Sequence, residues 1–211
     1  MAMRIRSSLV KVCLLASLAL VPARAAATPI LDQSAGADSA KDFGGANITG
    51  VAQTFTVGIE GILSRVDLLL LRYRSELEPV HIEIRRNLTD LTDASLLARV
   101  SLDPTVVPPY PGGGWLSIDF SPFGLQVTPG EQLALVIRYP IPTLYVWGVT
   151  VGDIYAGGHS YFFMNDQWNL GGGDQHFRTY VTPVPEPGVL ALLAVGGIGY
   201  LGGQRGRSAS R

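Results

Sequence analysis

The stretch Val80-His81-Ile82-Glu83-Ile84-Arg85 decides the fold class, because apolar and polar side chains alternate through it with a period of two. Successive side chains of a β-strand point to opposite faces, so the three apolar residues share one face and the three polar residues share the other. The pattern predicts a half-buried strand over residues 80–85.

The same alternation recurs along the middle of the chain, in runs separated by breakers such as Pro108-Pro109-Tyr110-Pro111-Gly112 and Gly171-Gly172-Gly173. No long run follows a helical period. Short strands at regular spacing predict an all-β domain, an antiparallel β-sandwich of jelly-roll type. The further strands expected are residues 53–57, 63–73, 96–102, 116–120, 133–139, 144–151, 161–164 and 177–181.

The start of the chain has the order of a secretory signal. Residues 1–11 carry Arg4, Arg6 and Lys11, residues 12–21 are predominantly apolar, and alanine-rich residues follow up to Ala27. An apolar run of this length spans roughly 15 Å as a helix, about half of a bilayer core. The sequence therefore predicts a signal helix that signal peptidase removes, after Ala25 or Ala27.

Three features follow one another at the other end of the sequence. The tetrapeptide Val184-Pro185-Glu186-Pro187 comes first, then an apolar, glycine-rich run over residues 188–203, then a tail with Arg205, Arg207 and Arg211. The prolines fix φ and remove amide donors, which favours an extended chain. The apolar run predicts a short transmembrane helix, and the three arginines are expected to stop it on the cytoplasmic side.

This order resembles the PEP-CTERM sorting signal of Gram-negative, exopolysaccharide-producing bacteria. The resemblance implies recognition of Pro185, Glu186 and Pro187 by exosortase, a membrane cysteine protease. It further implies transient insertion into the inner membrane, removal of the tail, and release or transfer to the cell envelope. It implies nothing about the chemistry of the domain in front of the signal.

The expected organisation is a signal peptide over residues 1–27, a linker or first edge segment over 28–50, a β-sandwich over 51–183 and the sorting signal over 184–211. Residues 28–183 hold nine basic and sixteen acidic side chains, a net charge of −7. This acidic balance argues against nucleic acid as a partner. Cys13, which lies in the signal, is the chain's single cysteine, so no thiol chemistry is expected of the mature domain.

No catalytic residues are predicted. His81, His159 and His176 have neither metal-binding nor catalytic spacing. No metal site and no cofactor are expected, although Asp153, Asn165, Asp166 and Asp174 are oxygen donors near turns and leave a calcium ion as an alternative to plain solvated acids.

The candidate ligand-binding residues are Trp168 and its neighbours Asn165, Asp166, Gln167 and Asn169, which precede a triple glycine. We interpret the segment as a loop that has little means of burying an indole, although the ring could also fold back against the sandwich. An exposed ring flanked by amides and a carboxylate suits a sugar, because the ring covers C–H faces and its neighbours bind hydroxyls.

The succession of strands over residues 52–57, 63–68 and 79–84 resembles the layout of carbohydrate-binding modules. Together with the sorting signal, this resemblance implies an extracellular-matrix or envelope protein whose sandwich binds exopolysaccharide without catalysis. A purely structural surface protein is the first alternative, and a glycan hydrolase is the second.

Overall fold

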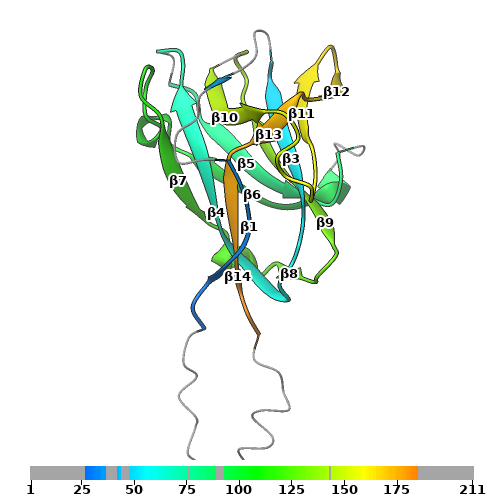
Figure 1. The fold of residues 1–211 in the computed structure, drawn as a ribbon. Coiled ribbons are helices and arrows are strands. Elements are labelled where there is room, and N and C mark those ends of the chain that lie inside the picture. Colours follow the sequence, from blue (N-terminus) through cyan, green and yellow to red (C-terminus); the bar gives the residue numbers. More distant parts are fainter. Residues whose placement is uncertain are drawn as a thin grey trace, which may run out of the picture.

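A computed structural model gives the fold of the region between the two predicted targeting segments (Figure 1). The predicted signal helix, the predicted transmembrane helix, the Pro-Glu-Pro tripeptide and the three terminal arginines lie outside the described residues. Those residues are 27–36, 42–43, 48–75, 77–88, 93–142 and 144–184.

Two antiparallel sheets form the domain. The order in the eight-stranded sheet is β1 (Ile30–Ala35), β14 (Phe177–Thr182), β4 (Gly61–Arg72), β10 (Tyr145–Val151) and β13 (Gly173–Gln175); β7 (Gly114–Asp119) and β8 (Gln126–Val127) also pair with β4, and β2 (Asp42–Phe43) pairs with β10. The order in the six-stranded sheet is β12 (Gln167–Leu170), β11 (Ser160–Met164), β3 (Gly50–Thr56), β9 (Gln132–Arg138), β5 (Val80–Arg85) and β6 (Leu96–Leu102).

Helical structure in the described residues is confined to three single turns of 3₁₀-helix: η1 (Asp93–Ser95), η2 (Pro104–Val106) and η3 (Ser121–Phe123). A proline near the start of η2 and of η3 suits these turns, because proline presets φ and lacks a donor that a first turn leaves unpaired anyway. The prediction of an all-β sandwich is confirmed.

The core lies between the two sheets and comes from the inward half of each alternating strand. Val80, Ile82 and Ile84 of β5 are fully buried there, as the alternation predicts. Phe55 of β3 and Phe177 of β14 meet across the core with ring centroids 6.0 Å apart. Burying such a side chain contributes about 1.5–3 kcal/mol, so this face of the strands holds the sheets together.

The outward half of β5 differs from the prediction of a half-buried strand. Glu83 and Arg85 are only 1% and 2% exposed. Arg85 Nε lies 2.6 Å from Glu83 Oε2, Arg99 of β6 lies 2.8 Å from Glu83 Oε1, and Arg85 donates to Ser95 Oγ. Glu83 and Arg85 are buried as an ion pair, and alternation alone cannot reveal such pairing.

The nine predicted strands are all present, with ends that shift by a few residues, but the interpretation of the Trp168 segment as a loop is wrong. Residues 167–170 form β12, a strand at the edge of the six-stranded sheet. Its residues pair with β11, with Phe163 opposite Trp168 and Tyr161 opposite Leu170.

The first and last strands lie side by side. Ile30 of β1 pairs with Val181 of β14, so the chain enters and leaves the sandwich at the same end. Figure 1 shows that end at the bottom of the view, with the β11–β12 hairpin near the opposite end. The β11–β12 hairpin and the connection to the sorting signal therefore lie near opposite ends of the sandwich.

Candidate functional site

The β11–β12 hairpin is built on a two-residue turn, Asn165-Asp166, with φ angles of 53° and 60°. Positive φ at both central positions is the geometry of a type I′ turn, which asparagine and aspartate tolerate better than most residues. Asn169 Nδ2 donates to the carbonyl oxygens of Met164 and Gln167, at 3.3 and 3.1 Å. Asn165 and Asn169 thus shape the hairpin.

Alternation along β12 turns Trp168 toward the outer face of the six-stranded sheet. Its ring lies edge-on to Phe163, with centroids 5.2 Å apart and an interplanar angle of 63°. Trp168 Nε1 is buried and has no hydrogen-bond partner among the described residues. Packing, rather than hydrogen bonding, therefore fixes the position of the half-buried indole.

Small side chains on the central strands provide the surface on which the indole rests. Ala52, Ala134 and Val136 form a buried cluster on this face, and Leu88, Tyr161 and Trp168 pack against it. In β3, a Cβ added at Gly50 would lie 3.4 Å from Trp168 Cη2. A floor of small residues beneath large aromatic ones leaves a hollow between them.

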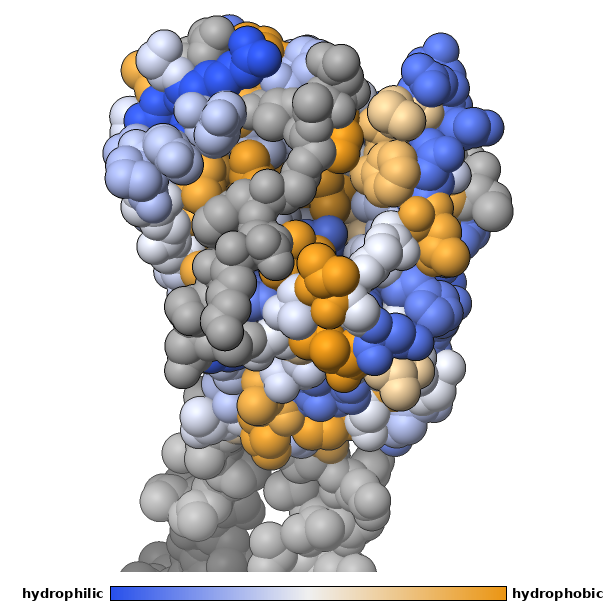
Figure 2. Space-filling model, turned by 45° about the horizontal axis from the view of Figure 1, so that its top comes forward, coloured by the Kyte–Doolittle hydropathy of each residue, from blue (hydrophilic) through white to orange (hydrophobic). Residues whose placement is uncertain are grey.

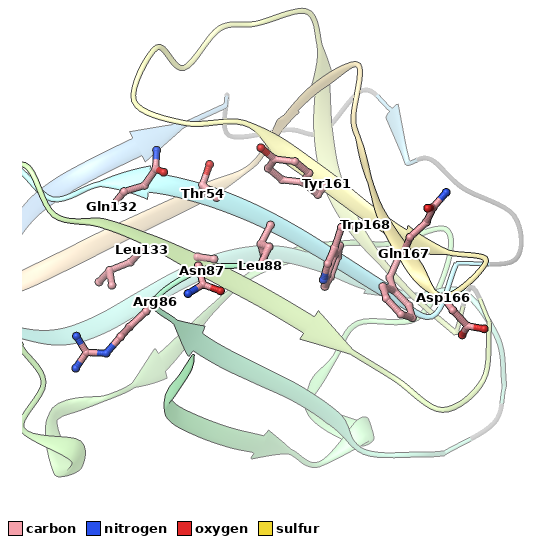
Figure 3. Close-up of a pocket in the computed structure, with 12 residues that line it drawn as sticks. Thr54, Arg86, Asn87, Leu88, Gln132, Leu133, Tyr161, Asp166, Gln167 and Trp168 are labelled. Atoms are coloured by element: carbon pink, nitrogen blue, oxygen red, sulfur yellow. The ribbon is translucent and has the colours of Figure 1, made fainter. Parts of the chain in front are cut away.

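That hollow is a pocket of about 580 Å³ (Figure 3). Figure 3 shows Trp168 and Tyr161 reaching over it from the hairpin, Thr54 and Gln132 on the two central strands, and Leu88 on the segment that follows β5. The described residues that line it are Thr54, Arg86, Asn87, Leu88, Gln132, Leu133, Ala134, Tyr161, Phe163, Asp166, Gln167 and Trp168.

Polar side chains surround the apolar centre of the pocket. Arg86, Asn87, Gln132, Asp166 and Gln167 are all exposed. The turn of the hairpin, at the upper right in Figure 2, is correspondingly hydrophilic. Figure 3 places the Arg86 guanidinium at the end of the pocket away from Trp168. The pocket therefore has aromatic rings at its centre. Its rim carries amide groups, a positively charged guanidinium and a negatively charged carboxylate, all of which can form hydrogen bonds.

Three of the five predicted ligand-binding residues, Trp168, Asp166 and Gln167, line this pocket. The other lining residues were not singled out from the sequence. A sequence signal for one of them does exist: Ala134 lines the pocket and, like its neighbours Ala52 and Val136, occupies an outward strand position where polar residues are usual.

A second pocket, of about 470 Å³, lies where β10, β11 and β13 meet. Its lining is mainly apolar, with Trp147, Phe162 and Met164 among its walls. Few of its side chains can bind hydroxyl groups, so it is a poorer match for a sugar than the pocket beside Trp168.

The oxygen donors considered for calcium either form hydrogen bonds within the protein or are exposed to solvent. Asp174 is 1% exposed and accepts hydrogen bonds from Gln53 Nε2 at 3.0 Å and from the backbone of Ile154 and Tyr155 at 2.8 and 2.9 Å. Asp153 is exposed. Within the described part of the chain, no group of three histidine, cysteine or acidic side chains could hold a metal ion.

The three histidines also lie apart from one another. His81 Nδ1 is 2.8 Å from Ser101 Oγ on the outer face of β5 and β6, whereas His159 is exposed. His176 is fully buried, and its Nε2 is 2.7 Å from Thr150 Oγ1. None of the three lines the pocket beside Trp168.

Several groups with displaced pKa values lie in the core or in turns. Burial raises the pKa of the Tyr139, Tyr145 and Tyr155 hydroxyls. Hydrogen bonds from Thr105, first through its side chain and then through its backbone, lower the pKa of Asp103. None of these four groups lines the pocket beside Trp168. Their pKa shifts result from burial in the core and from hydrogen bonds in a turn.

Comparison with known families identifies one part of the chain. Residues 183–207 match the PEP-CTERM protein-sorting motif. No curated protein and no solved structure matches the chain. Among the residues described by the structure, no helix is long and apolar enough to cross a membrane. The chain carries the sorting motif of an exported protein that exosortase processes, and the domain in front of the motif must be understood from its own geometry.

Proposed function

We propose that this exported, exosortase-sorted protein binds extracellular polysaccharide, without catalysis, in the pocket beside Trp168. The observation that carries the proposal is the placement of Trp168 and Tyr161 around a floor of small side chains, with amide, carboxylate and guanidinium groups at the rim. Aromatic faces pair with the C–H faces of pyranose rings, and the rim groups can bind the hydroxyls.

The size and exposure of the pocket agree with this role. A volume of about 580 Å³ falls within the usual range of small-ligand sites, about 300–1,000 Å³. The pocket lies on the outer face of a sheet, where a long polymer can pass without threading into the core. The sandwich would accordingly act as a carbohydrate-binding module, and its assignment to the jelly-roll type belongs to this proposal.

The cellular part of the proposal follows from the two ends of the sequence. Residues 1–27 would be removed by signal peptidase, and residues 188–203 would hold the protein briefly in the inner membrane with Arg205, Arg207 and Arg211 on the cytoplasmic side. Cleavage near Pro185–Pro187 would then release the domain to the envelope or the extracellular matrix.

A purely structural surface protein is the second candidate. It is favoured by the packing of Trp168 against Phe163 and against the buried cluster of Ala52, Ala134 and Val136, which gives the ring a structural role without a ligand. A glycan hydrolase is the third candidate. Asp166 supplies the single carboxylate among the described lining residues, whereas most glycosidases use two.

Co-sedimentation of the mature protein with insoluble exopolysaccharide from its own organism tests the proposal, combined with an assay for released reducing sugar. Saturable binding without sugar release is expected. Absence of binding would favour the structural protein, and release of reducing sugar would favour the hydrolase.

A further inference from the structure

The place where the chain leaves the sandwich is fixed by close packing. A Cβ added at Gly61 would lie 2.4 Å from the Thr182 carbonyl oxygen and 3.0 Å from Pro183 Cα. Thr182 also pairs with Ile62 of β4. Because Gly61 has no side chain, the chain stays in contact with the sheet as far as Pro183.

The sorting motif begins where this contact ends. The motif match starts at residue 183, and three peptide steps separate Thr182 from Pro185. An extended chain spans at most about 3.6 Å per residue, so a protein that binds Pro185 works within about 11 Å of the end of β14. A membrane protease is far larger than this distance, and it must contact the folded sandwich while it holds the motif.

Four exposed apolar side chains lie near this exit point. Ile30, Leu31, Phe123 and Val184 are 49%, 48%, 43% and 49% exposed. Ile30 pairs with Val181 and Leu31 with Tyr180, next to the last residues of β14. These four residues form the exit surface.

Phe123 lies in η3, which directly follows Phe120. The backbone N–H of Phe120 donates to Ser64 O at 2.8 Å, and this places η3 near the start of β4, where Ile62 pairs with Thr182. A hollow of about 270 Å³ between the start of β1 and the end of β7 has Thr182, Ser121 and Arg65 in its lining. Single exposed apolar residues are ordinary on proteins, but four near the point where the chain leads into a processing motif are positioned for a partner.

We propose that the exit surface is a docking site for the membrane protease that processes the sorting motif. The protease would bind the motif and the base of the folded sandwich together, so recognition would extend beyond Pro185–Pro187. The short connection after Thr182 makes this contact unavoidable, and the exposed apolar side chains make it favourable, because contact removes them from water.

Site-specific photo-crosslinking in the full-length chain tests the proposal, in cells that contain catalytically inactive exosortase. The crosslinking residue replaces Phe123 in one chain and Leu77 in a control. Leu77 is 58% exposed and lies just before β5, whose first residues lie beside the end of β9, away from the exit surface. An adduct with the protease from position 123 but not from position 77 is expected. Adducts with lipid alone, or equal adducts from both positions, would overturn the proposal.

A processing assay with active exosortase gives an independent readout. The pair Ile30→Ser and Phe123→Ser should slow tail removal at least about fivefold, whereas Leu77→Ser should leave it unchanged. Thermal melting checks that the variants fold. Inserting about ten glycine and serine residues between Thr182 and Pro183, ahead of the matched motif, with a reach of about 17 Å, should also slow processing while the sandwich stays intact. Normal processing of the inserted chain would contradict a fixed docking geometry.

Discussion

Gly50 leaves the space in which Trp168 lies: a Cβ added at Gly50 would come within 3.4 Å of Trp168 Cη2 and within 3.2 Å of Phe163 Cβ. Gly50→Val should therefore push the aromatic pair outward and destabilise the domain by about 1–3 kcal/mol through overpacking. Urea denaturation measures the stability, and near-UV circular dichroism reports on the rings. An unchanged ring signal would show that the floor does not set the position of Trp168.

The hairpin turn offers a change that separates stability from binding. Asp166 has φ of 60° in a type I′ turn, where glycine is preferred at the second position. Asp166→Gly should stabilise the domain by at most about 1 kcal/mol, because glycine avoids the roughly 1–2 kcal/mol cost of a Cβ at positive φ but is freer in the unfolded chain. If Asp166 also contacts a glycan, the same variant should bind more weakly despite its greater stability. Thermal melting and a binding titration on one preparation distinguish these effects, and a lower stability would contradict the turn assignment.

Removing one partner of the buried Glu83–Arg85 ion pair should destabilise the domain strongly, whereas replacing both partners with apolar residues should destabilise it less. Glu83→Ala removes the buried carboxylate that lies 2.6 Å from Arg85 Nε, so we expect the free energy of unfolding to fall by about 3–5 kcal/mol. The double variant Glu83→Leu with Arg85→Met should lose less than the sum of the two single changes. Chemical denaturation of all four proteins measures the coupling, and strict additivity would contradict it.

Asp174 should hold the segment before β11 in place. It accepts hydrogen bonds from Gln53 and from the backbone of Ile154 and Tyr155, so Asp174→Ala would leave buried donors unpaired. Each unpaired donor costs about 1–3 kcal/mol, and we expect the melting temperature to fall sharply. Asp153→Ala, at an exposed position, is the control and should change little.

The alternation in the sequence predicted the strands well because burial between two sheets imposes a period of two on each of them. It missed β12, since the strand is short, the residues that alternate with Trp168 along it include the polar Gln167 and Asn169, and a triple glycine follows. It also gave no pairing order, because alternation is a property of one strand alone. The contact of β1 with β14 joins residues as distant as Ile30 and Val181.

The same limit applies to the candidate site. Trp168, Asp166 and Gln167 are neighbours in sequence and were found, whereas Tyr161, Leu88 and Thr54 reach the pocket from separate strands and segments. Only the pairing of β11 with β3, and of β3 with β9, brings them together. Composition and motifs cannot supply that information.

Isothermal titration of the mature protein with soluble exopolysaccharide fragments, alongside Trp168→Ala, tests the proposed function most directly. Trp115→Ala is the matched control, because Trp115 is a half-buried tryptophan of β7 on the other sheet. We predict that Trp168→Ala weakens binding by about 1–3 kcal/mol while Trp115→Ala binds like the wild type, provided that melting shows both to be folded. Absence of binding by the wild-type protein, or equal binding by Trp168→Ala, would contradict the assignment of this pocket as a glycan site.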